Sequence, residues 1–145
     1  IRDRDWRNEM QVLPIGKGKK LCDGDDIAVL SIGPIGNEVI KAIEMVKEEG
    51  VSIAHYDMIY LKPLDEELLH EIGQKYNRII TVENGVIKGG FGSAVLEFMA
   101  DNGYTPHVKR IGVPDAFIEH GSIPELYQLC GMDAESIAKQ LKKEN

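Results

Sequence analysis

The sequence predicts an α/β fold with a doubly wound, mostly parallel sheet and an antiparallel edge strand. Apolar, β-branched segments of strand length alternate with segments in which apolar residues recur at helical spacing, a pattern typical of a parallel sheet covered by helices on both faces. The segment "DIAVLSIG" (26–33) is apolar in succession, as in a strand buried on both faces. The opening "LPIGKGKKLCDGDD" differs, since its short alternating residues and "DGDD" turn indicate an edge strand hairpinned onto 26–33.

A helix and a second strand follow that first core strand. "NEVIKAIEMVKEEG" (37–50) has helical spacing and ends at Gly50, where a C-terminal cap belongs. "VSIAHYDMIYL" (51–61) predicts the next strand, which Pro63 ends.

The middle of the chain continues the alternation. "PLDEELLHEIGQKY" (63–76) predicts a helix with Asp65 near its N-terminal dipole. A catalytic amine at Lys62 is the less favoured interpretation of the same segment. "NRIITVE" (77–83) predicts a third strand.

The last part of the chain supplies one strand and three helices. "FGSAVLEFMADNG" (91–103) predicts a helix closed by Gly103, and "HVKRIGV" (107–113) predicts the fourth strand. A short helix beginning at Ile123 then stops at Gly131. The final helix is expected to begin at a cap formed by Asp133 or Ser136.

Composition indicates one domain and excludes several classes of partner. The chain has 145 residues, 43% of them hydrophobic, and a formal net charge of −7, so we expect neither nucleic acid nor an anionic membrane as the main partner. Two cysteines without a CxxC pattern indicate reduced thiols in the cytoplasm. No apolar run is long enough to span a bilayer, and the first residues have no signal-peptide core.

The carboxyl ends of the predicted strands are the expected place for a ligand. In open parallel sheets, ligands bind beyond these ends. Four segments there carry Gly or Pro and at least one polar group, and we expect them to gather along one edge: "SIGPIGN" (31–37), "YDMIYLKPLD" (56–65), "VENGVIKGGFGS" (82–93) and "GVPDAFIEHG" (112–121).

The Gly-rich turn before residue 91 raises the question of a phosphate site. It lacks the third small residue of a dinucleotide fingerprint, since Val95 stands there, and no Gly-Lys-Ser/Thr follows. Gly92 and Ser93 could present amides to an anion at a helix start. The favoured interpretation is that the glycines permit close helix–sheet packing or positive φ angles.

Two titratable side chains stand at the same edge. Glu83 could act as a general base, although capping of neighbouring N–H groups is favoured. His120 could shuttle protons near neutral pH or hold a loop through one hydrogen bond. The histidines have no metal-ligand spacing, and neither a GxSxG elbow nor a Cys–His pairing supports nucleophilic catalysis. We therefore expect no catalytic, cofactor-binding or metal residue, and a ligand-facing edge formed by Glu83, Gly92, Ser93 and His120.

Four segments together carry a resemblance to a known family: "LPIGKGKKLCDGDDIAVLSIG" (13–33), "DMIYLKPLDEELL" (57–69), "VENGVIKGGFGSAV" (82–95) and "IGVPDAFIEHGSIPELYQLCGMDAESI" (111–137). In this order and spacing they resemble the C-terminal domain of the 1-deoxy-D-xylulose-5-phosphate synthases, which are transketolase-like, thiamine-diphosphate-dependent enzymes. Where that family usually reads Val-Glu-Glu-Asn, this chain has an amide, Asn84, in place of the second carboxylate.

The resemblance implies a Rossmann-like, transketolase C-terminal-type scaffold at 13–145, preceded by a remnant of an interdomain linker at 1–12. It implies a homodimeric transferase that condenses pyruvate with glyceraldehyde 3-phosphate, and whose preceding domains bind thiamine diphosphate and Mg²⁺. This domain would pack on those domains and be inactive alone. Because no Met opens the sequence, we expect a piece of a longer chain. Two alternatives remain: a stand-alone binding or regulatory module, and the C-terminal piece of a transketolase or of a 2-oxo acid dehydrogenase β subunit.

Overall fold

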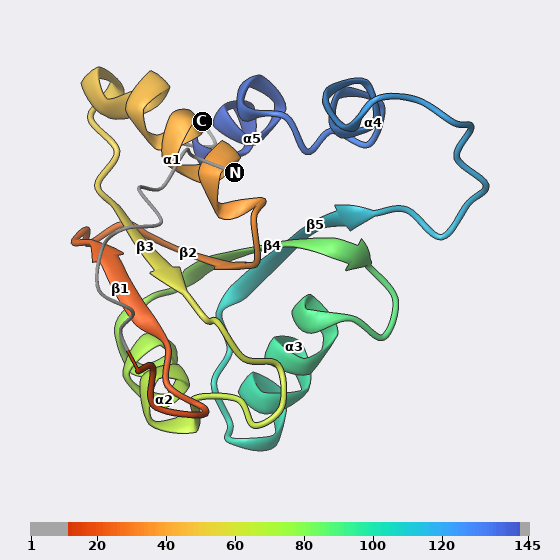
Figure 1. Ribbon diagram of the computed structural model, residues 1–145. Coiled ribbons are helices and arrows are strands. Elements are labelled where there is room, and N and C mark those ends of the chain that lie inside the picture. Colours follow the sequence, from red (N-terminus) through yellow and green to blue (C-terminus); the bar gives the residue numbers. More distant parts are fainter. Residues whose placement is uncertain (1–11, 143–145) are drawn as a thin grey trace.

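The computed structural model describes residues 12–142, which form a five-stranded sheet between two layers of helices (Figure 1). The strands are β1 (Lys19–Cys22), β2 (Ile27–Ile32), β3 (Ile53–Asp57), β4 (Arg78–Val86) and β5 (His107–Val113). They are arranged in the order β1-β3-β2-β4-β5. β2, β3, β4 and β5 run parallel, and β1 pairs antiparallel with β3. The predicted doubly wound α/β fold with an antiparallel edge strand is confirmed.

Helices cover both faces of this sheet. They are α1 (Gly36–Val46), which continues into the 3₁₀ turn η1 (Lys47–Glu49), α2 (Glu66–Lys75), α3 (Phe91–Asp101), α4 (Ile123–Leu129) and α5 (Ala134–Leu141). Figure 1 shows α1 and α5 on one face and α2 and α3 on the other. Ile27 and Val29 of β2 belong to the first core layer, whereas Ala28 and Leu30 belong to the second. Both faces of β2 are therefore buried, which is why its sequence is apolar without alternation.

The helix ends follow the signals in the sequence. Gly50 adopts a left-handed φ of 75° after η1, and Gly103 and Gly131 adopt φ angles of 74° and 66° at later helix ends. The Asp65 side chain accepts a hydrogen bond from the amide of Leu68 at 3.2 Å and so caps α2. Asp133, the first of the two expected caps, plays this part for α5.

The predicted hairpin between the opening strand and 26–33 is wrong, because β1 pairs with β3. After β1 the chain passes across the start of β3 before it enters β2, and the amides of Asp26 and Ile27 both donate to the carbonyl of Ser52. A Cβ atom at Gly24 would overlap the backbone of Ile53. The glycine therefore permits a crossing of two backbones where the sequence suggested a tight turn.

Two strand boundaries also differ from the prediction. β3 ends at Asp57 instead of Leu61, because Ile59 has a φ of 58° that leaves the extended conformation. The Asp57 carboxylate stabilises this bend by accepting a bond from the Ile59 amide at 3.1 Å. β4 instead runs beyond residue 83 to Val86, with a shift of register against β5 after Val82.

Candidate functional site

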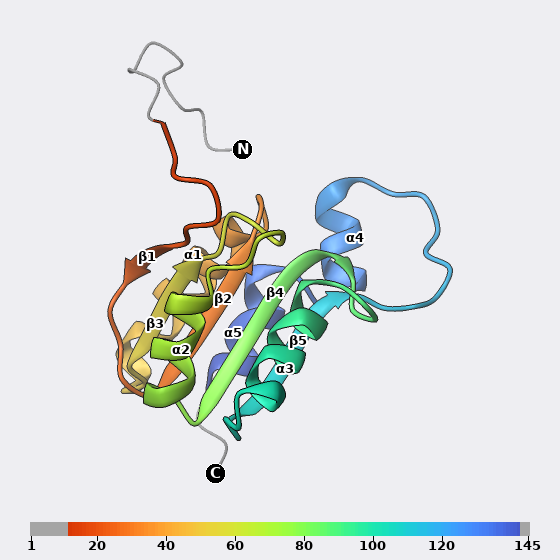
Figure 2. The ribbon, with the colours of Figure 1, turned by 90° about the horizontal axis from the view of Figure 1, so that it is seen from below.

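The carboxyl ends of the four parallel strands meet at one edge of the sheet, which we call the carboxyl edge. Residues 33–35, 58–65, 87–90 and 114–122 leave β2, β3, β4 and β5 there, as expected from the sequence. Residues 12–18 lie at the same edge, because Lys19 at the start of β1 pairs with Asp57 at the end of β3. Figure 2 shows these segments along the upper and right-hand side of the sheet. From β2 the chain goes first to β3 on one side and then to β4 on the other side, so the strand order reverses its direction between β2 and β4. Open α/β sheets bind ligands at such a position.

Glu83 is buried at this edge, at 4% exposure, and holds the start of α3. Its two carboxylate oxygens accept hydrogen bonds from the amides of Phe91 at 2.7 Å and Gly92 at 2.9 Å. α3 has Gly90 at its N-cap position, where no side chain is available to accept such bonds. A carboxylate from the neighbouring strand thus satisfies two orphan amides and complements the positive end of the helix dipole.

The Gly-rich turn is shaped by this contact. A Cβ atom at Gly90 would overlap the Glu83 carboxylate, and one at Gly92 would lie 2.5 Å from the Thr81 hydroxyl. Gly89 has a left-handed φ of 73°. The position that an anion would take at this helix end is filled by Glu83, so the arrangement binds the turn to the sheet.

Ser93 and Arg110 fasten the other side of the same turn. The Ser93 hydroxyl donates to the carbonyl of Ile87 at 3.1 Å and accepts from the amide of Gly89 at 3.0 Å. The Arg110 guanidinium donates to the Ser93 hydroxyl at 2.8 Å and to the Ile87 carbonyl at 3.0 Å. Glu83, Gly92 and Ser93 are therefore brought together. The sequence analysis did not identify Arg110. Its signal in the sequence is a basic residue directly before the apolar end of β5.

His120 lies apart from that group, on the exposed loop between β5 and α4. It borders a cavity of about 430 Å³ whose walls include Asn84, Glu119 and Tyr127. The Tyr127 hydroxyl donates to the Asn84 side-chain oxygen at 3.3 Å and so joins α4 to the end of β4. His120 thus borders the same cavity as Asn84, the residue that follows Glu83 in the sequence.

A second cavity lies where chain direction reverses, between the start of α1 and α4. It has a volume of about 570 Å³ and is bordered by Pro34, Asn37, Lys41 and Asn84, among others. Lys41 is paired with Glu38 at 2.6 Å. The other Glu38 oxygen accepts from an α5 amide at 3.2 Å. Lys41 and Glu38 thus engage each other, and Glu38 also holds the start of α5.

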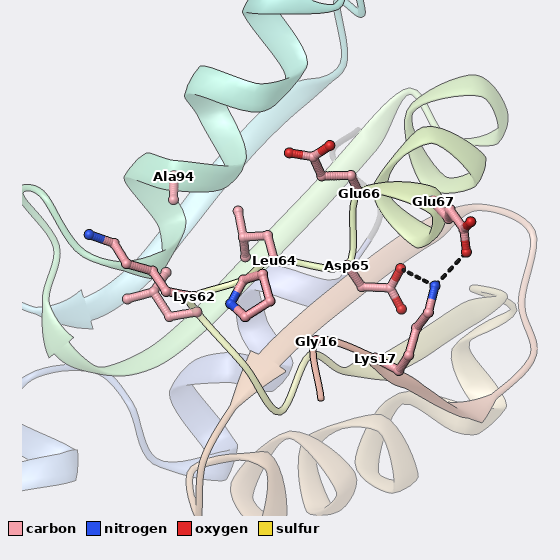
Figure 3. Close-up of a pocket in the computed structure, with 10 residues that line it drawn as sticks. Gly16, Lys17, Lys62, Leu64, Asp65, Glu66, Glu67 and Ala94 are labelled. Atoms are coloured by element: carbon pink, nitrogen blue, oxygen red, sulfur yellow. Dashed lines mark hydrogen bonds and ion pairs between the residues drawn. The ribbon is translucent and has the colours of Figure 1, made fainter. Parts of the chain in front are cut away.

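A third cavity, of about 620 Å³, lies beside the loop after β3 (Figure 3). Lys17 forms ion pairs with Asp65, at 3.7 Å, and with Glu67. The hydrogen bond that Lys17 donates to Glu67 raises the pKa of Lys17, and the charge of Asp65 raises it further. Lys62 points away from this cluster in Figure 3. Lys17 thus links the segment before β1 to the start of α2.

Within residues 12–142, no group of three or more His, Cys, Asp or Glu side chains is placed to hold a metal ion. No helix in the described part of the chain is long and apolar enough to cross a membrane.

Comparisons with known proteins extend this description. The family model for the transketolase C-terminal domain matches residues 16–137. The chain is 98% identical over 142 residues to a 1-deoxy-D-xylulose-5-phosphate synthase of Parabacteroides distasonis, and 61% identical over 141 residues to one of Bacteroides thetaiotaomicron. These matches cover 98% and 97% of this chain but 22% of each relative. The chain therefore spans about a fifth of the length of the curated relatives it matches.

Solved structures agree with the fold. A split-gene transketolase, described as an inactive β4 tetramer, is similar with a TM-score of 0.78 and 30% identity, over 90% of this chain and 44% of that one. A transketolase from Campylobacter jejuni has a TM-score of 0.63 over 86% of this chain and 18% of that one. At 13% identity, the second likeness concerns the fold alone.

Proposed function

The chain belongs to the transketolase C-terminal domain family, and from this premise we propose that it is the C-terminal domain of a 1-deoxy-D-xylulose-5-phosphate synthase. One observation carries the proposal: 98% identity over 98% of the chain to a protein with that name. The longer enzyme would condense pyruvate with glyceraldehyde 3-phosphate and release CO₂. Its product would feed isoprenoid, thiamine and pyridoxal biosynthesis in the cytoplasm.

Within that enzyme the domain acts as a scaffold, and the other domains supply the chemistry. Thiamine diphosphate, which provides carbanion chemistry when bound, and Mg²⁺ belong to those domains. Two features support this assignment: the first amides of α3 donate to Glu83, and the Asp65 carboxylate caps α2 and pairs with Lys17. The described residues do not fit a diphosphate–metal site.

The proposed ligand-facing residues divide into two roles. Glu83, Gly92 and Ser93 hold the turn after β4 in shape, so that it presents a fixed surface to a neighbouring domain. His120 faces the cavity beside Asn84, where a polar group of that neighbouring domain could reach it. We propose residues 13–145 as the domain and 1–12 as linker; residues 1–11 and 143–145 lie outside the described part of the chain. The whole enzyme is proposed to be a homodimer.

An activity assay tests the function. The full-length polypeptide and the 145-residue chain are each incubated with pyruvate, glyceraldehyde 3-phosphate, thiamine diphosphate and Mg²⁺. We expect 1-deoxyxylulose 5-phosphate from the full-length protein and none from the chain. Product from the isolated chain would overturn the scaffold role, and an inactive, folded, cofactor-loaded full-length protein would overturn the synthase assignment.

An immunoblot of source-cell extract with an antibody to this domain separates the proposal from a stand-alone module. We expect a band several times larger than the 16.2 kDa of this chain. A band near 16.2 kDa would instead assign the domain an independent binding or regulatory function.

A further inference from the structure

The cavity of about 570 Å³ between the start of α1 and α4 lies where the strand order reverses its direction. Open α/β sheets bind ligands at this position, and the volume falls within the range of small-molecule sites. We call it the switch cavity. Its wall combines apolar groups with side chains that form hydrogen bonds, among them Asn37, Asn84, Ile123, Pro124, Tyr127 and Asp133.

The helix starts at the switch cavity do not favour an anion. The first three amides of α1 donate to the carbonyls of residues 33–35, at 2.9 to 3.1 Å. The Ala134 amide at the start of α5 donates to Glu38 at 3.2 Å. The amides that bind an anion at a helix start are therefore already engaged here.

The charged side chains around the switch cavity favour a cation instead. Two carboxylates, Glu38 and Asp133, border it against one ammonium group, that of Lys41. Lys41 and Glu38 pair with each other at 2.6 Å. Among the described residues that line the cavity, Asp133 is therefore the carboxylate available to a ligand, in a chain whose formal net charge is −7.

The Asp133 carboxylate has one oxygen without a donor. Its Oδ2 atom accepts a hydrogen bond from the Ser136 amide at 3.4 Å, whereas its Oδ1 atom is buried and has no hydrogen-bond partner within residues 12–142. Burial alone would raise the pKa of Asp133, but the hydrogen bonds with Ser136 outweigh it and the pKa is lowered. The group is thus charged at neutral pH, and a cationic donor in the adjoining cavity would relieve the cost of the unpaired oxygen.

The opposite wall suits the apolar part of a ligand. Ile123, Pro124 and the ring of Tyr127 all belong to α4. The Tyr127 hydroxyl donates to the Asn84 side-chain oxygen at 3.3 Å, which holds the ring at the cavity. An aromatic ring near a carboxylate is a typical setting for an ammonium group, which is attracted to both.

We propose that the switch cavity binds a small organic ammonium ion, an amine carried on an apolar ring. Asp133 would hold the ammonium group, and Tyr127 with its α4 neighbours would contact the ring. This site goes beyond the function proposed above and does not depend on it.

Methyl NMR of the full-length polypeptide tests the inference, with ¹³C at the δ1 methyl groups of isoleucine. The probes are tryptamine, tryptophol and indole-3-propionate, which share an indole ring and end in an ammonium, a hydroxyl and a carboxylate group. We expect tryptamine to shift the Ile123 signal saturably at millimolar concentration, tryptophol to bind at least about tenfold more weakly, and indole-3-propionate not to bind.

Three results of this titration would overturn the inference. The first is the absence of a saturable shift at Ile123 with tryptamine. The second is binding of tryptophol or indole-3-propionate as tight as that of tryptamine. The third is a larger shift at Ile118, which borders the neighbouring cavity of about 430 Å³ but not the switch cavity.

Two pairs of variants test the electrostatic cause. Asp133→Asn keeps the cap of α5, because Asn and Asp cap helices about equally well, and should weaken tryptamine binding at least about tenfold. Asp101→Asn, at the end of α3 on the opposite face of the sheet, changes the net charge equally and should alter the affinity less than about twofold. Equal effects of the two substitutions would reject the ammonium site.

The second pair predicts a gain of affinity and does not depend on the folding of Asp133→Asn. Lys41 and Lys47 are both exposed and both pair with a glutamate three residues earlier. Lys41→Gln removes the positive charge from the switch cavity and should strengthen tryptamine binding about threefold. Lys47→Gln, outside the cavity, should leave it unchanged, and a Lys41→Gln variant without tighter binding would refute the proposal.

Discussion

The Nε2 atom of His55 and the hydroxyl oxygen of Ser31 lie 2.8 Å apart in the buried interior of the sheet. The two residues come from the neighbouring strands β3 and β2. Burial lowers the pKa of His55 to about 4, so the imidazole is neutral in the folded protein at neutral pH. A neutral ring nitrogen can hold the serine hydroxyl without the cost of an unpaired buried charge.

Stability is therefore expected to fall as the pH is lowered from about 6.5 to about 4. Above this window His55 is neutral in both states. Within it the unfolded chain binds a proton that the folded chain does not, and below it both are protonated. Across the whole window, His55 is expected to change the free energy of unfolding by about 3 kcal/mol. Urea denaturation of the 145-residue chain across this window should show a smaller loss for His55→Gln than for the original sequence. Exposed His107→Gln is the control, and an identical loss in His55→Gln would contradict the prediction.

Replacing Glu83 by Gln should lower the free energy of unfolding by about 2 kcal/mol. The amide group of Gln keeps one acceptor oxygen but turns an N–H₂ toward the second of the two amides at the start of α3. Chemical denaturation measures the change. Glu97→Gln, on the exposed side of α3, should shift stability by no more than about 0.5 kcal/mol; equal effects of the two changes would show that the Glu83 contact contributes nothing.

Gly89 and Gly90 should respond differently to the same substitutions. Gly89 needs a left-handed φ but has open space around it, so Ala should cost about 1 kcal/mol and Asn, which tolerates this conformation, less. At Gly90 a Cβ would overlap Glu83 and lie 2.5 Å from the Val86 carbonyl oxygen. Ala and Asn should both cost about 2 kcal/mol or more there. Thermal denaturation of the four variants tests this, and rescue of position 90 by Asn would be incompatible with a steric cause.

Arg110→Lys should loosen the turn after β4. One terminal nitrogen of the guanidinium donates both to the Ser93 hydroxyl and to the Ile87 carbonyl. The lysine side chain is one bond shorter, so its ammonium does not reach the position of that nitrogen, and the loss of one bond costs about 1 kcal/mol. Hydrogen exchange of the Gly89 amide should accelerate, with little change in α2. The exposed neighbour Lys109→Ala serves as control. Unchanged exchange at Gly89 in Arg110→Lys would refute the fastening role.

Local signals in the sequence were enough to predict the order of elements. Gly50, Gly103 and Gly131 mark helix ends, and Asp65 marks a helix start, because each acts within a few residues of the chain. The partner of β1 could not be predicted in this way, since pairing with β3 depends on a crossing at Gly24 that involves residues far along the chain. The early end of β3 depends on the φ of Ile59, a residue type that rarely adopts a positive value.

The candidate site was predictable in position but not in detail. Parallel strands carry their following loops to one edge, so Glu83, Ser93 and His120 could all be assigned to it. Their contacts could not, because the donor to Ser93 is Arg110 on another strand. The apolar residues of α4 have the spacing of a core helix, but the structure leaves Ile123 and Leu129 exposed and packs the partly buried Tyr127 against the first core layer.

The two border strands determine how this domain behaves among copies of itself. An open sheet border offers unpaired N–H and C=O groups to any passing strand. β1 is only four residues long, carries Lys19 and Lys20, and has a register shift after Lys20, while Lys109 is exposed on β5 at the opposite border. Charge, brevity and irregularity together discourage strand addition. If β1 were cut away, the border would pass to β3, whose buried apolar residues would then template edge-to-edge aggregation.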